Sequence, residues 1–192
     1  MKFSQAQNDV RRAYLYGAPG MFVSGLLWLF TAALAQRGDV TRAMVALFVG
    51  GMFIFPVSAL LTRALGGAAT LPKGHPMLAL AMQSAFIVPV GWPIVVAAGM
   101  TREAWYFAAA GVLVAVHYFP FMSLYGMRLF GVLAVALLGG VFASIALAPG
   151  SVAASAWSTG AVEVIFACVA MAQWRAQRGA RPGYAAASSG VH

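Results

Sequence analysis

One carboxylate and one histidine are the residues of this chain with the clearest capacity for chemistry inside a membrane. Glu163 lies near the middle of an apolar stretch, residues 151–174, and His117 lies inside another, residues 105–124. An ionisable side chain at membrane depth is costly to bury, so it usually has a partner or a function. Both residues lie at a similar depth when each stretch is counted as a helix, and such a pair could relay protons. We therefore expect a Glu163–His117 pair, or a structural partner for Glu163 such as a Ser, a Tyr or a backbone group.

Prolines surround this region of the predicted bundle. Tyr118 and Pro120 follow His117, and Gln83 lies a little before Pro89 in another apolar run. A proline removes a helical hydrogen bond, and broken helices at membrane depth form the binding sites of many transporters, although they also occur in proteins that transport nothing. The candidate intramembrane polar site consists of Glu163, His117, Gln83 and Tyr118.

Three arginines lie at the ends of apolar runs. Arg11 and Arg12 precede the first run, and Arg128 precedes the fifth. These side chains could contact the headgroups of anionic lipids. The sequence favours a second explanation over this one, in which they determine membrane orientation and anchor the helices at the interface.

The elements that must position these residues are six apolar runs. The 192-residue chain is 62% hydrophobic and 8% charged, and a helix that spans a membrane needs about 20 apolar residues. Continuous runs favour helices over a barrel of alternating strands, and short connections make consecutive helices antiparallel neighbours. We predict an all-α membrane fold, a six-helix transmembrane bundle, with spans at residues 16–35, 43–61, 77–98, 105–124, 129–148 and 152–174.

The basic residues predict an orientation. If the N-terminus is cytoplasmic, nine of the 12 Lys and Arg residues lie on that side and three on the other, which is the pattern of cytoplasmic loops. Both termini are therefore expected in the cytoplasm. The predicted regions are a cytoplasmic N-terminal segment (1–13), a six-span domain (14–174) and a flexible cytoplasmic tail (175–192).

The first run could also be a secretory signal, because small residues, Ala33-Leu34-Ala35, end it as at a cleavage site. Against cleavage, the run is long enough to span, and the second run follows after a short loop. We expect an uncleaved first span.

Several classes of function find no support in the sequence. It has no glycine-rich phosphate loop, His-Glu-x-x-His motif or nucleophile elbow, and its one cysteine, Cys168, lies inside the last run. We expect no metal, no cofactor and no nucleic-acid partner. The expected partners are the lipid bilayer and either a second copy of the chain or another membrane protein.

Four segments combine charged, glycine and aromatic residues: Asp9-x-Arg11-x-Ala13-Tyr14, Gly17-x-x-Gly20-x-x-x-Ser24-Gly25-x-x-Trp28, Gly50-Gly51-Met52-x-Ile54-Phe55-Pro56 and Leu124-Tyr125-Gly126-Met127-Arg128. With these segments the chain resembles a family of small bacterial multi-pass integral membrane proteins of unknown function. The resemblance implies a location in the bacterial inner (cytoplasmic) membrane, and no activity, ligand or catalytic residue.

Two interpretations of function follow. The chain is a non-catalytic membrane scaffold or accessory protein, or it is a small, proton-coupled transporter or permease that uses the Glu163 and His117 pair. A membrane enzyme acting on lipid would need a nucleophile or metal site that the sequence does not offer.

Overall fold

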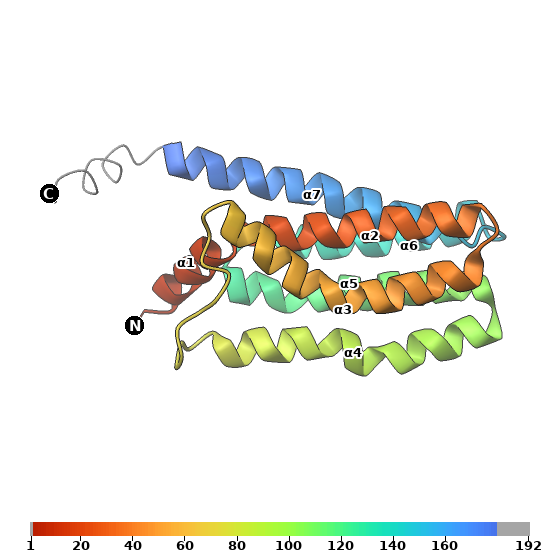
Figure 1. The fold of residues 1–192 in the computed structure, drawn as a ribbon, viewed down its shortest axis with the longest axis horizontal. Coiled ribbons are helices and arrows are strands. Elements are labelled where there is room, and N and C mark those ends of the chain that lie inside the picture. The colour runs from red at the N-terminus through yellow and green to blue at the C-terminus, as the bar shows by residue number, and fades with distance from the viewer. Residues whose placement is uncertain (1, 180–192) are drawn as a thin grey trace, which may run out of the picture.

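Long helices make up nearly all of the computed structural model, which describes residues 2–179. All regular elements of this part are helical (Figure 1). Six of the helices are long and apolar enough to cross a membrane, which supports the predicted multi-pass membrane protein. The elements are α1 (Phe3–Ala13), the 3-10 turn η1 (Leu15–Gly17), α2 (Ala18–Gln36), α3 (Val40–Ala64), α4 (Leu78–Thr101), α5 (Glu103–Tyr125), α6 (Leu129–Leu147) and α7 (Ala154–Gly179).

The six long helices form an open ring. Closely packed pairs join α4 to α5, α5 to α6, α6 to α7, α7 to α2, and α2 to α3. The first and last members of this series, α3 and α4, are not a closely packed pair, although Phe48 and Trp92 meet with ring centroids 5.7 Å apart. The fold therefore brings α7 against α2, although the two helices are far apart in sequence (Figure 1). It leaves the ring open on the side between α3 and α4.

The N-terminal segment contains a helix that the sequence analysis did not predict. Helix α1 buries Ala6, Val10 and Ala13 and packs against α5 and η1. A turn with positive φ values at Leu15 (48°) and Tyr16 (60°) separates it from α2. Such values are disfavoured for residues with a side chain, and they allow α1 to turn away from the direction of α2 (Figure 1).

The ends of the spans agree with the predicted runs to within a few residues, with one larger difference. Helix α7 continues through Gly179, beyond the expected end at residue 174, and α1 lies at the same end of the bundle as the C-terminal end of α7 (Figure 1). The rest of the predicted tail, residues 180–192, lies outside the described residues.

Candidate functional site

Glu163 is completely buried in the centre of the bundle, on α7. Its Oε1 atom accepts a hydrogen bond of 2.7 Å from the Tyr118 hydroxyl of α5, and Ser24 of α2 is a second hydroxyl near the carboxyl. Among the described residues, no cationic group forms an ion pair with it. The site is therefore one carboxyl group held by neutral hydroxyls from neighbouring helices.

A glycine on α2 allows the carboxyl to lie this deep. A Cβ atom at Gly25 would lie 2.8 Å from Val164 Cγ2 and 3.1 Å from Glu163 Cβ. Real Cβ atoms do not approach so closely, so α2 and α7 could not pack at this distance with a larger residue. Small residues serve this purpose in membrane helices generally.

Two further hydroxyls lie on the same face of α7 as Glu163. Ser155 and Thr159 precede it at intervals of four residues, and all three are buried. The Ser155 hydroxyl hydrogen-bonds to Ser144 of α6 at 2.6 Å, whereas Thr159 Oγ1 and Glu163 Oε2 are buried without a partner. Residues 2–179 contain no group of three or more His, Cys, Asp or Glu side chains suited to a metal ion.

A cleft of about 550 Å³ lies where the ring is open. Helices α2, α3, α4 and α5 form its walls, and most of its lining is apolar or aromatic, with Trp28, Phe48 and Trp92 among the large side chains. Phe48 and its neighbour Met52 are 42% and 60% exposed, so the cleft reaches the outer surface between α3 and α4.

Polar groups are few along the cleft, and those nearest to Glu163 lie on α5 and α2. His117, Tyr118 and Ser24 are among its lining residues. The His117 Nδ1 atom lies 2.6 Å from the Ser84 carbonyl of α4. A carbonyl only accepts hydrogen bonds, so Nδ1 carries the proton and Nε2 is the acceptor of the neutral ring. Tyr118, the next residue, lines the cleft and also donates a hydrogen bond to Glu163. Glu163 itself does not line the cleft.

The structure brings only part of the predicted polar site together. Glu163 pairs with Tyr118 rather than with His117, whose ring binds α4. Gln83 is exposed on α4 and does not line the cleft. The sequence analysis missed Ser24 and Thr159. Thr159 could have been found, because its spacing of four from Glu163 places both residues on one helix face.

The predicted lipid-contacting arginines differ in their surroundings. Arg11 Nη1 donates to the carbonyls of Tyr125 (2.6 Å) and Gly126 (3.3 Å), so it binds the C-terminal end of α5, where a cation is favourable. Arg12 and Arg128 are exposed. One of the three arginines therefore has a structural role, and two remain accessible to a ligand.

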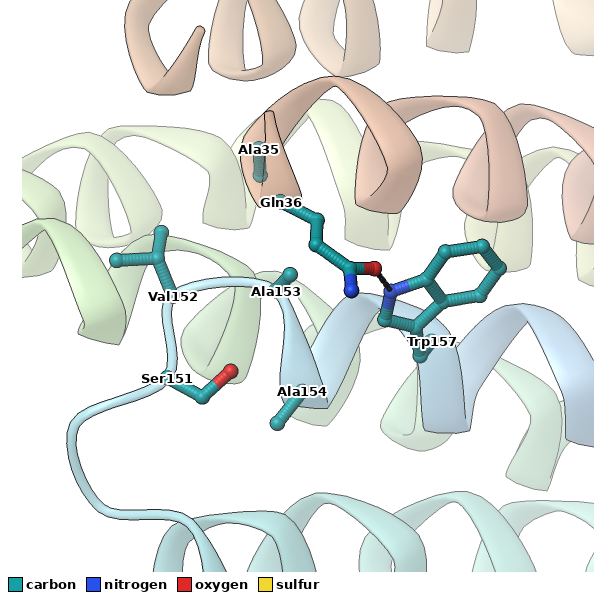
Figure 2. Close-up of a pocket in the computed structure, with 7 residues that line it drawn as sticks. All are labelled: Ala35, Gln36, Ser151, Val152, Ala153, Ala154 and Trp157. Carbon is teal, nitrogen blue, oxygen red and sulfur yellow. Dashed lines mark hydrogen bonds between the residues drawn. The ribbon is translucent and has the colours of Figure 1, made fainter. Parts of the chain in front are cut away.

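A second hollow, of about 460 Å³, lies at the opposite end of the bundle, where α2 ends and α7 begins. Figure 2 shows the Trp157 indole directed at the Gln36 side chain, to which its Nε1 atom donates a hydrogen bond of 2.9 Å. The rest of its lining is Ala35 of α2 and residues 151–154, from the turn before α7 and its first residue. This hydrogen bond ties the two helix ends together, and the hollow offers no ionisable side chain.

Comparison with known proteins identifies one family. The model of a family of unknown function, DUF7010, matches residues 3–173. No curated protein and no solved structure matches the chain. The expected resemblance to a family of unknown function is confirmed at that level, and the match covers α1 and almost all of the six long helices.

Proposed function

The chain belongs to this family of unknown function, DUF7010, and we propose that it is a membrane protein that binds one acyl chain of an anionic lipid. The binding site is the cleft between α3 and α4. In this role the protein acts as a non-catalytic scaffold or accessory protein of the membrane. The observation that carries the proposal is the large apolar cleft that opens laterally from the bundle.

The shape and lining of the cleft suit a hydrocarbon chain. An apolar pocket with a few convergent polar groups is the usual form of a ligand site. The α3 wall extends from Leu47 to Thr62, which is about 20 Å of helix. One leaflet of a bilayer core is about 15 Å thick, half of the total, so the cleft is long enough for one chain.

Charge favours an anionic headgroup at the N-terminal end of the bundle. The cleft reaches Tyr14 and Thr62 there, and exposed basic residues of this end include Arg12, Arg63 and Lys73. A cluster of basic residues beside the membrane attracts anionic lipids. We further propose that this end faces the cytoplasm of a bacterial inner membrane, because it carries most of the basic residues.

Filling the cleft tests the proposal. A Cβ atom at Gly51 or Gly20, both on the cleft wall, would meet no atom within 4 Å, and the same holds at Gly139, which is exposed on α6 away from the cleft. We expect Gly51→Leu and Gly20→Leu to lower the lipid retained per chain by roughly tenfold. Displacing two methylenes costs about 1.6 kcal/mol at ~0.8 kcal/mol each. Gly139→Leu should retain as much lipid as the wild type.

Native mass spectrometry and extraction of lipid from the purified protein provide the measurement. Protein reconstituted in phosphatidylglycerol should retain more lipid than protein reconstituted in phosphatidylcholine. Equal retention in the Gly51→Leu and Gly139→Leu variants would contradict the proposal. If cross-linking shows that Gly51→Leu instead disrupts a dimer, the cleft is an interface between two copies of the chain.

A proton-coupled transporter is the second candidate function. One observation favours it, the hydrogen bond that joins the cleft residue Tyr118 to the buried carboxyl of Glu163. In that case ligand occupancy of the cleft and the protonation of Glu163 would be linked.

A further inference from the structure

We propose that Glu163 is a proton-binding site that exchanges its proton with the cleft through the hydroxyl group of Tyr118. This inference concerns the carboxyl and its connection, and it does not depend on which ligand the cleft takes. It assigns a relay function to a pair of residues on α5 and α7.

The Tyr118 hydroxyl gives the carboxyl a direct hydrogen-bonded connection toward the cleft. Glu163 is fully buried and does not line the cleft, whereas Tyr118 does. The Tyr118 hydroxyl lies 2.7 Å from Glu163 Oε1, which is a normal distance for a hydrogen bond of this type. Two hydroxyls therefore lie between the carboxyl and the cleft, those of Tyr118 and Ser24, and the measured hydrogen bond is the one from Tyr118.

Within the described part of the chain, the other carboxylate oxygen has no hydrogen-bond partner of its own. Glu163 Oε2 and Thr159 Oγ1 are both buried without a hydrogen-bond partner. Buried polar groups normally have a partner, because leaving one unpaired is costly. A proton on the carboxyl removes the negative charge that this unpaired oxygen would otherwise share inside the bundle.

No fixed charge from the neighbouring helices competes for this role. Helices α2 and α6, which pack against α7, contain no charged residue and no histidine. On α5, His117 is bound to the Ser84 carbonyl of α4, and Tyr106 donates to the Met44 carbonyl of α3. Tyr16 of η1 bonds to Gln177, near the end of α7. A proton is the simplest positive charge that Glu163 can acquire.

The relay step balances without any other reagent. The Tyr118 oxygen accepts a proton from the cleft while the original Tyr118 proton passes to Glu163 Oε1. Two O–H bonds form, one at each residue, and one O–H bond of Tyr118 breaks; the bond from the proton donor in the cleft breaks as well. Rotation of the Tyr118 hydroxyl resets the pathway, and the reverse sequence releases the proton.

Infrared spectroscopy of the reconstituted protein tests the relay. The C=O stretch of a protonated carboxyl is resolved from the carboxylate bands and shifts when the proton is replaced by deuterium. We expect a band that appears as the pH is lowered, that is absent in Glu163→Gln, and that shifts in D2O. Tyr118→Phe should slow this shift by roughly a hundredfold, the lower part of the range for a positioned proton-transfer group.

Tyr106→Phe is the matched control, because Tyr106 is an equally buried tyrosine of α5 that does not contact Glu163. It should exchange at the wild-type rate. Equal exchange rates in Tyr118→Phe and Tyr106→Phe would overturn the relay. If Tyr118→Phe fails to fold, the wild-type protein still decides the matter, because a band that never shifts in D2O excludes exchange. A band that disappears when sodium replaces potassium at constant pH would identify a metal cation as the ligand instead.

Discussion

At the residue scale, Glu163 is held by a hydrogen bond and not by an ion pair. Its partner Tyr118 is buried, and the ring of Tyr118 lies against Phe130 with centroids 6.2 Å apart and against Phe121 at 5.6 Å. These contacts fix the ring, so the hydroxyl is directed at the carboxyl before any ligand arrives. Hydrogen bonds between membrane helices contribute about 0.6 kcal/mol to stability on average. The main effect of this hydrogen bond is therefore to specify which faces of α5 and α7 meet, and its effect on stability is small.

Two substitutions at Glu163 separate the acceptor from the charge. Glu163→Gln keeps an oxygen for Tyr118 and should change the free energy of unfolding little. Glu163→Leu leaves the Tyr118 hydroxyl buried without an acceptor, and we expect a loss of about 1–3 kcal/mol. Unfolding in SDS, followed by tryptophan fluorescence, measures both. Glu103→Gln, at an exposed carboxyl, is the control and should have no effect. Equal losses for Gln and Leu at Glu163 would mean that Tyr118 does not need this acceptor.

At the element scale, glycines determine which helices approach α7. A Cβ atom at Gly160 of α7 would lie 2.9 Å from the backbone nitrogen of Leu29, and one at Gly111 of α5 would lie 2.9 Å from Thr159 Oγ1. With Gly25, these positions allow α2 and α5 to contact α7 closely. Small residues of α6 also pack against α7, since Ser144 bonds to Ser155 and Gly140 lies beside Ser158. This face of α6 is therefore inside the bundle.

Gly25→Ala should destabilise the contact between α2 and α7. The added methyl group would overlap Val164 and Glu163, and overpacking of this kind costs about 1–3 kcal/mol. Alanine is otherwise the better helix former by up to about 1 kcal/mol, so Gly139→Ala, with no atom within 4 Å of the new methyl group, should be neutral or stabilising. Thermal unfolding of the two variants measures the difference, and equal melting temperatures would contradict the close approach.

At the scale of the whole molecule, the open ring explains why α3 and α4 are the least buried helices. They carry large exposed side chains such as Phe55, Met82 and Phe86. In a membrane these side chains meet lipid, and in a dimer they would meet a second copy. The lipid-binding proposal and the accessory role both depend on this one open side.

The orientation of the bundle can be measured by cysteine labelling. The turn between α6 and α7 and the loop between α3 and α4 lie at opposite ends of the bundle (Figure 1). In a Cys168→Ala background, Ser151→Cys introduces an exposed thiol in the first of these segments and Thr70→Cys in the second. Because the basic residues gather at the end of Thr70, we expect a membrane-impermeant maleimide to label Ser151→Cys in intact cells and Thr70→Cys only after the cells are opened. The reverse result would place both described ends of the chain outside the cytoplasm.

The sequence by itself determined the six apolar helices and the depth of Glu163. Helix formation is local, and the bilayer fixes how many apolar residues a span needs, so continuous runs were enough to find the spans. The α1 helix was missed because its pattern of buried residues is short, with Ala6, Val10 and Ala13 as its members. The turn at Leu15 and Tyr16 was missed too, because positive φ values are uncommon for these residue types.

Only the tertiary structure decided which side chains meet. Spans that are apolar on every side carry no pattern that tells which face turns inward, so the order of the ring and the opening between α3 and α4 could not be read from the sequence. For the same reason the sequence left two partners open for Glu163, His117 or a group such as a Ser or a Tyr, and the structure selects Tyr118, the residue after His117 and about 100° further around the helix. Close contacts at single glycines fixed which helix faces meet, because one added methyl group is enough to hold two helices apart.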